Sequence, residues 1–238
     1  MHMIDLHLNP KHLVKHAQSG SHNRLYDEDL GYAAHAWLMA TFGDISPNCF
    51  RLTETRDGEL RLLGYGPASA EEMQTRASTY ATPQAYAVCD WSTIASKSLA
   101  HIPLSASKVL GFEIRICPVR RGERGERDAY LAAVEASTEP SSSDRAKVYS
   151  TWLQERLSDA AAIDTSATEM TGFRLISAWR RRHDSQGRAG RGHRLTRPDA
   201  LMRGRLTITD EVGFLNLLGH GIGRHRAFGF GMLLLRPA

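Results

Sequence analysis

The sequence has few cysteines and no long apolar run. Of its 238 residues only Cys49, Cys89 and Cys117 are cysteines, and no two form a CxxC pair. This odd, scattered set indicates neither a disulfide framework nor a zinc site. We therefore expect buried thiols in a reducing compartment and a cytoplasmic protein. No apolar run approaches the ~20 residues of a membrane span and no signal-peptide pattern begins the chain, so we expect no membrane partner.

Lysine is scarce too, although the chain is basic. Lysine and arginine total 30 against 26 acidic residues, which gives a formal net charge of +4. The lysines are Lys11, Lys15, Lys97, Lys108 and Lys147, and every other cation of this kind is arginine. Arginine binds phosphate in a planar, bidentate way and stacks on bases, so the balance favours an anionic partner. A GC-rich genome would raise the arginine content equally well.

The arginines gather toward the C-terminus. After Arg174 the only acidic residues are Asp184, Asp199, Asp210 and Glu211. Against them stand Arg180, Arg181, Arg182, Arg188, Arg191, Arg194, Arg197, Arg203, Arg205, Arg224, Arg226 and Arg236. We interpret this asymmetry as a nucleic-acid-binding surface, with a plain solvated surface as the alternative.

The first half of the chain alternates strand and helix patterns. We expect a strand in 3–9, a helix in 26–43, a hairpin in 49–66, a helix in 68–78 and a strand in 84–94. In the first helix, which Asp27 and Asp29 can cap and Gly43 can end, the buried stripe is predicted to be Leu30, Ala34, Trp37, Leu38 and Thr41. Asp57 and Gly58 fit the hairpin turn, and Ser69 with Glu72 fits a capping box.

The second half repeats this order. We expect a strand in 108–121, a polar loop in 120–128, a helix in 141–162, a long hairpin in 171–209, a helix in 210–221 and a strand in 226–237. The order β-α-β-β-α-β is the ferredoxin-like pattern. The predicted fold class is α+β, with two tandem ferredoxin-like (RRM-like) βαββαβ domains at 1–96 and 107–238.

The segment GHGIGRHRAFGFGMLLL, residues 219–235, combines glycines with cations. It lacks the third glycine of a dinucleotide-binding fingerprint and leads from a helix into a strand, which is the reverse of the order that fingerprint needs. It also lacks the Gly-Lys-Ser/Thr of a Walker loop, so we expect no nucleotide cofactor. Two interpretations stay open: a loop whose N–H groups approach phosphate, or a turn followed by a bulged strand.

GIGRHRAFGFGMLLLRP, with RGRLTITDEVGFLNLLGH before it, resembles the glycine-rich C-terminal motif of the RAMP-superfamily endoribonucleases that cleave CRISPR repeats, in their CasE-like branch. The resemblance implies two ferredoxin-like domains and metal-independent cleavage of CRISPR precursor RNA within each repeat. The ribose 2′-OH would attack, leaving a 2′,3′-cyclic phosphate and a 5′-OH. The enzyme would then retain the repeat hairpin, alongside other subunits of an effector complex. A type I-E system fits the likeness, and a type IV system stays open.

The same resemblance points to LGYAAH in the first predicted helix. Family members carry Y-x-x-H there, which corresponds to Tyr32 and His35, and the family's proline before the tyrosine is replaced by Gly31. Residues at i and i+3 share a helix face, and neither belongs to the predicted buried stripe. An imidazole beside a phenol can supply the proton transfers of RNA cleavage. Without the resemblance, the pair fits an exposed histidine and a partly exposed tyrosine that have no catalytic function.

The remaining assignments concern how RNA is held. The arginines expected to grip the hairpin stem are Arg180, Arg181, Arg182, Arg188, Arg191, Arg194 and Arg197. The glycine segment would place the strand near the cut through Gly221, Gly223, Arg224, His225 and Arg226, with Arg115, Arg120 and Arg121 extending the track. No metal site is expected, because Asp27, Glu28 and Asp29 fit helix-start residues. A non-catalytic hairpin-binding subunit and an RNA-associated protein unrelated to CRISPR are the alternatives.

Overall fold

The structure is a computed structural model that describes residues 1–19, 30–55, 57–100, 102–122, 125–136, 144–183 and 189–238. Between 178 and 195 it describes only the backbone of the strands. The expected helix caps Asp27 and Asp29, and also Arg188, lie outside the described residues. No helix in this part of the chain is long and apolar enough to cross a membrane.

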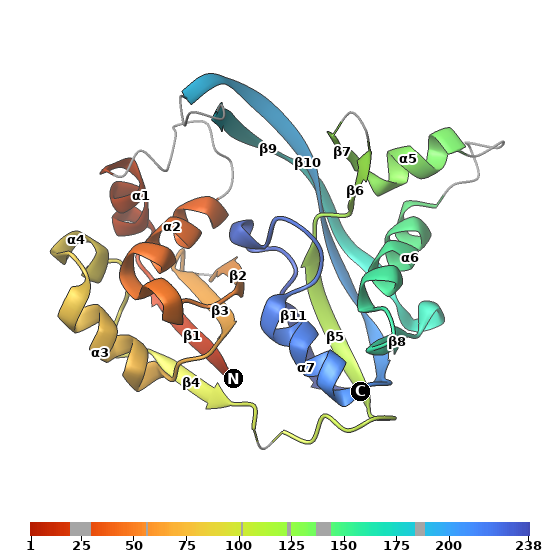
Figure 1. The fold of residues 1–238 in the computed structure, drawn as a ribbon, viewed down its shortest axis with the longest axis horizontal. Coiled ribbons are helices and arrows are strands. Elements are labelled where there is room, and N and C mark those ends of the chain that lie inside the picture. The colour runs from red at the N-terminus through yellow and green to blue at the C-terminus, as the bar shows by residue number, and fades with distance from the viewer. Residues whose placement is uncertain (20–29, 56, 101, 123–124, 137–143, 184–188) are drawn as a thin grey trace.

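The N-terminal half is a four-stranded antiparallel sheet with helices on one face (Figure 1). Its elements are β1 (His2–Leu8), α1 (Pro10–Ser19), α2 (Gly31–Phe42), a 3₁₀ turn η1 (Gly43–Ile45), β2 (Cys49–Glu54), β3 (Leu60–Gly66), α3 (Ala70–Tyr80), α4 (Pro83–Tyr86) and β4 (Ala95–Ser98). The strand order β2-β3-β1-β4 is that of a ferredoxin-like domain.

Period-two alternation decides which face of this sheet the helices cover. In β1, Ile4, Leu6 and Leu8 are buried under the helices, while Asp5 and His7 stand on the opposite face. The predicted stripe of α2 is confirmed, since its members from Ala34 to Thr41 are at most 2% exposed. The capping box at the start of α3 is also confirmed, with both of its hydrogen bonds present.

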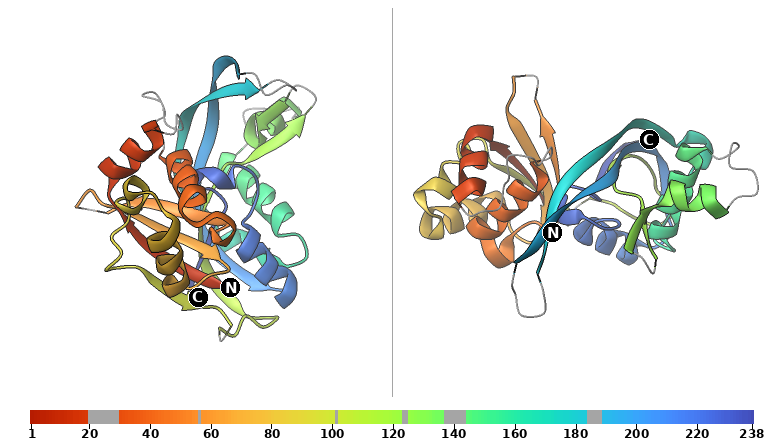
Figure 2. Two further views of the ribbon diagram at one scale, coloured as in Figure 1. Left: turned by 60° about the vertical axis from the view of Figure 1, so that its left-hand side comes forward. Right: turned by 90° about the horizontal axis from the view of Figure 1, so that it is seen from above.

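The C-terminal half has the same topology around a longer hairpin. Its elements are β5 (Val109–Ile116), β6 (Val119–Gly122), β7 (Gly125–Asp128), α5 (Ala129–Ala136), α6 (Arg145–Leu157), β8 (Ala161–Ile163), η3 (Thr165–Ala167), β9 (Glu169–His183), β10 (Ala189–Ile208), α7 (Glu211–His220), η4 (Arg226–Phe228) and β11 (Leu233–Pro237). The strand order is β11-β5-β10-β8, and β9 pairs along the same edge of β10. The β9–β10 hairpin rises beyond its sheet at the top of Figure 1, and Figure 2 shows the same hairpin from two further sides.

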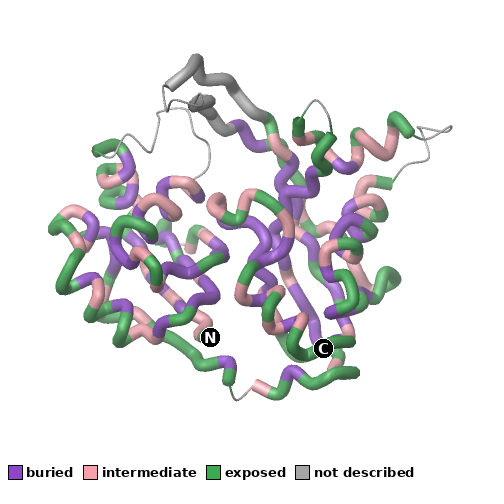
Figure 3. Tube along the Cα trace, in the orientation of Figure 1, coloured by how far each residue is buried: buried purple, intermediate pink, exposed green. Residues whose placement is uncertain are grey.

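The two halves pack directly against each other. The Tyr65 hydroxyl on β3 donates to the Leu233 carbonyl on β11 at 3.0 Å, and the Cys49 thiol on β2 donates to the Leu218 carbonyl on α7 at 3.3 Å. Figure 3 shows buried chain on both sides of this contact. Cys49, Tyr65 and Leu104 belong to the same apolar cluster as the core of the C-terminal sheet. The packing fixes the C-terminal elements relative to α2.

Two expectations about local structure are wrong. The strand expected in 84–94 is replaced by the short helix α4, because Thr82 caps the first turn and Pro83 occupies its first position; the edge strand β4 follows at Ala95. The polar loop expected in 120–128 is the β6–β7 hairpin, which the buried Val119 anchors. The boundaries at 1–96 and 107–238 stay predictions.

Candidate active site

The candidate catalytic pair lies in the first turns of α2. Tyr32 and His35 are both half-buried, and their ring centroids are 6.3 Å apart. They share one side of the helix because they are three residues apart, whereas Ala34, Trp37 and Leu38 face the core. The structure thus brings the imidazole and the phenol together on an accessible surface.

The glycine segment reaches this pair from the other half of the molecule. The Phe228 ring, in η4, stacks on Tyr32 with centroids 5.4 Å apart and planes 19° apart. Gly31 makes this approach possible, because a Cβ at that position would lie 2.3 Å from the Phe228 carbonyl oxygen. Gly31 therefore stands where backbone meets backbone.

The surroundings of His35 favour the neutral form of its imidazole. Burial lowers the pKa of His35 from its usual value of 6.5, because the charged form loses hydration there. A neutral imidazole at physiological pH can accept a proton, which is what a general base requires.

A carboxylate outside the predicted set gathers the cations of the glycine segment. Arg224 Nε donates to Glu126 Oε1 at 2.5 Å, His225 Nε2 lies 2.7 Å from Oε2, and Arg197 Nη2 donates to Oε2 at 3.1 Å. Burial alone would raise the pKa of Glu126, but His225, Arg224 and Arg197 together hold it below the usual range. Because an ionised carboxylate only accepts hydrogen bonds, His225 Nε2 carries the proton in this pair.

The glycines themselves are positions of close packing. Gly221 is buried at φ +75°, its N–H donates to the Leu217 carbonyl at 2.8 Å, and a Cβ would lie 2.7 Å from that of Cys49. At Gly223, φ is +80° and a Cβ would lie 2.6 Å from the Trp152 ring. The Gly221 N–H therefore ends α7 and is already paired, and the contact of Gly221 with RNA stays a prediction.

Arg115, expected to contact RNA, lies beneath the surface. It is 8% exposed, donates to both carboxylate oxygens of Asp199 at 2.8 and 2.9 Å, and lies over the Phe230 ring at 4.3 Å. Arg174 also donates to Asp199 at 2.7 Å, so both arginines hold its pKa below the usual range although burial opposes this. Arg115 thus joins β5 to β10 through Asp199, and its carbonyl accepts from the Gly231 N–H at 2.8 Å; its contact with RNA stays a prediction.

The other predicted cations differ in what the structure shows of them. Arg120 and Arg121 are exposed on β6, where Arg120 donates to Glu155 at 2.6 Å. Arg226 is exposed and donates to the His220 carbonyl at 2.5 Å. The backbones of Arg180, Arg181, Arg182, Arg191 and Arg194 lie in the β9–β10 hairpin, but their side chains are outside the described set.

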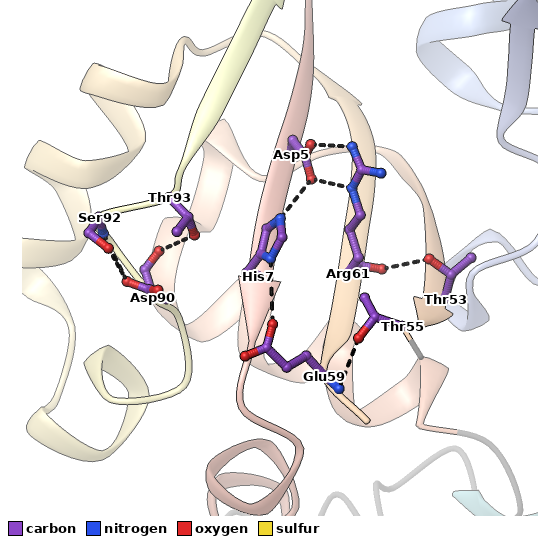
Figure 4. Close-up of polar contacts among 9 residues, drawn as sticks. All are labelled: Asp5, His7, Thr53, Thr55, Glu59, Arg61, Asp90, Ser92 and Thr93. Atoms are coloured by element: carbon purple, nitrogen blue, oxygen red, sulfur yellow. Dashed lines mark hydrogen bonds and ion pairs between the residues drawn. The ribbon is translucent and has the colours of Figure 1, made fainter. Parts of the chain in front are cut away.

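A second charged group lies on the face of the N-terminal sheet opposite its helices, where opposite charges already meet (Figure 4). Arg61 makes a two-pronged contact with Asp5 at 2.9 and 2.5 Å, and His7 lies 3.9 Å from Asp5 and 3.8 Å from Glu59. Its two carboxylates offset Arg61, so it offers an anion less than the cations around the glycine segment do.

Sequence reasoning missed Glu126 and the stacking role of Phe228. Glu126 lies 98 residues from Arg224, within a run of charges that resembles an ordinary polar loop. Only the spatial meeting of β7 with the glycine segment identifies it.

Comparisons with known proteins agree with this architecture. A family model described as CRISPR associated protein matches residues 1–237. A solved CRISPR endoribonuclease Cse3 bound to a 19-nucleotide RNA is similar over 100% of both chains, at 19% identity and a TM-score of 0.62. Cse3 of Thermus thermophilus, bound to an RNA representing a pre-cleavage complex, is similar over 99% of this chain and 98% of its own, at 17% identity and a TM-score of 0.55.

The CRISPR-associated protein Cas6e of Escherichia coli K-12 is similar over 100% of both chains, at 20% identity and a TM-score of 0.51. No curated protein sequence matches the chain. The solved structures share the fold, and the family model covers nearly every residue. The chain therefore belongs to the family of CRISPR-associated proteins.

Proposed function

We propose that the chain is a metal-independent endoribonuclease that cleaves CRISPR precursor RNA within its repeats. The observation that carries this proposal is the docking of the glycine segment on α2, which stacks Phe228 on Tyr32 beside His35. A packing role alone does not require an imidazole with a lowered pKa and a phenol on the accessible side of the same helix turn.

In the proposed reaction His35 acts as the general base. Its neutral imidazole takes the proton of the ribose 2′-OH, whose oxygen attacks the neighbouring phosphorus. The Tyr32 hydroxyl donates a hydrogen bond to the phosphorane or to the departing 5′-oxygen. The bond between phosphorus and that oxygen breaks, and the oxygen takes a proton from the Tyr32 hydroxyl, which the proton held by His35 then replaces; the products are a 2′,3′-cyclic phosphate and a 5′-OH.

The repeat hairpin is proposed to lie along the arginine-rich surface. An A-form stem exposes phosphates and a deep, narrow major groove, so shape and charge carry its recognition. The hairpin arm β9–β10 and the exposed Arg121 and Arg224 supply cations on the same half of the molecule as η4. The solved relatives bound to RNA, and one similar chain in a CRISPR RNA-guided surveillance complex, are consistent with retention of the product in a larger assembly.

Incubation of the purified chain with its cognate repeat RNA in EDTA tests the proposal. We expect one cut per repeat, a cyclic phosphate on the upstream product, and no cut when the nucleotide 5′ to the scissile phosphate carries a 2′-deoxy sugar. Cleavage of the 2′-deoxy RNA would refute the 2′-OH mechanism. Tight binding of the repeat without cleavage would instead favour a non-catalytic hairpin-binding subunit.

A further inference from the structure

The carboxylate of Glu126 joins three segments that are distant in the sequence. It lies on β7 and holds Arg224 and His225 of the glycine segment together with Arg197 of β10. The Glu126 side chain is only 14% exposed, and Arg197 and His225 are also largely buried, so these two contacts are better shielded from water than ordinary surface pairs, whereas Arg224 is half exposed.

His225 adopts a backbone conformation that needs such support. Its φ is +62°, in the left-handed region that residues other than glycine seldom occupy. A residue stays there when the surrounding structure holds it. Glu126 holds the His225 ring at 2.7 Å, and the His225 carbonyl accepts a hydrogen bond from the Phe228 N–H at 2.9 Å.

The conformation at His225 sets the position of Phe228. The two ring centroids are 5.9 Å apart, and Phe228 in turn stacks on Tyr32 at 5.4 Å. A continuous series of contacts therefore leads from β7 through the glycine segment to the candidate catalytic turn of α2.

We propose that Glu126 is a positioning residue for RNA cleavage: it fixes the glycine segment and, through Phe228, sets Tyr32 beside His35. The inference rests on the proposed function. In the alternative, the carboxylate only competes with RNA phosphates for Arg197, Arg224 and His225, and its removal would tighten RNA binding without slowing cleavage.

Single-turnover cleavage by the full chain in EDTA, with enzyme in excess over the cognate repeat RNA, distinguishes these roles. We expect Glu126→Ala to lower the maximal rate about 10- to 100-fold, as loss of an orienting partner does. The half-saturating enzyme concentration should change less than about threefold, because positioning is a rate effect. Glu126→Gln, which keeps the shape and one acceptor, should retain more of the rate than Glu126→Ala.

Glu135→Gln is the matched control, because Glu135 pairs with Arg127, which lies next to Glu126 in the sequence, and not with a cation of the glycine segment. It should cleave as the wild type does. A wild-type maximal rate in Glu126→Ala would overturn the inference. A change in the half-saturating enzyme concentration without a lower maximal rate would overturn it as well.

Limited trypsin digestion without RNA gives a readout independent of activity. Cuts after Arg224 and Arg226 should form at least about fivefold faster in Glu126→Ala than in the wild type or Glu135→Gln, because the segment is less firmly held. Equal cutting rates would overturn the inference. If the wild type leaves repeat RNA intact, the proposed function fails, and the trypsin comparison alone decides whether Glu126 holds the segment.

Discussion

Gly31→Ala is the change that most sharply tests the contact between the two halves. The added Cβ would lie 2.3, 2.6 and 2.9 Å from the carbonyl oxygen, carbonyl carbon and Cα of Phe228, all of them backbone atoms. Ordinary contact begins at 3.4 Å, so η4 must withdraw from α2. The withdrawal is about 1 Å, and a displacement of that size at a reacting centre costs about 100-fold in rate.

Alanine in a helix is up to ~1 kcal/mol more favourable than glycine, so the variant should not unwind α2. We therefore expect a single-turnover rate about 100-fold below wild type, with the thermal unfolding midpoint and the affinity for repeat RNA largely kept. Gly172→Ala is the matched control, because its Cβ meets only the Leu201 Cβ at 3.5 Å. A wild-type rate in Gly31→Ala would refute the claim that this approach positions the site.

Three further predictions follow from the same geometry. Tyr32→Phe keeps the ring that stacks on Phe228 and removes the hydroxyl, so the cleavage rate should fall about 100-fold while binding is kept; an unchanged rate would exclude the hydroxyl from the chemistry. Because burial lowers the pKa of His35, the rate should rise with pH through a midpoint below 6.5 and then level off, and a rate that falls over this range would contradict a base role. Arg121→Ala should weaken binding and reduce the slope of log affinity against log salt by about 0.9, whereas an unchanged slope would place Arg121 off the RNA track.

Local sequence patterns predicted the parts of the fold that local physics decides. The stripe of α2 and the hairpin turn at Gly58 were predictable, because each depends on residues a few positions apart. The prediction of a strand in 84–94 was wrong although the competing signal is also local. The apolar Val88 and Cys89 suggest a strand, whereas Thr82 and Pro83 begin a helix.

The parts of the site that could not be predicted from the sequence depend on contacts between residues far apart in the chain. Tyr32 and His35 were reached through a family resemblance together with helix spacing, whereas the stacking of Phe228 on Tyr32 joins residues almost at opposite ends of the chain. Arg115 reads as an exposed cation in the sequence, but Asp199 and the Phe230 ring enclose it. Residue type alone does not distinguish an arginine that is available to bind RNA from one that is already paired with a carboxylate.

Cleavage of native repeat RNA in EDTA by His35→Ala beside the wild type, with RNA binding measured in parallel, tests the role of His35 without intermediate assumptions. We expect the wild type to cut each repeat, and His35→Ala to bind the RNA with similar affinity but to cut it at least about 100-fold more slowly. Cleavage by His35→Ala at the wild-type rate would contradict the assignment of the active site to α2.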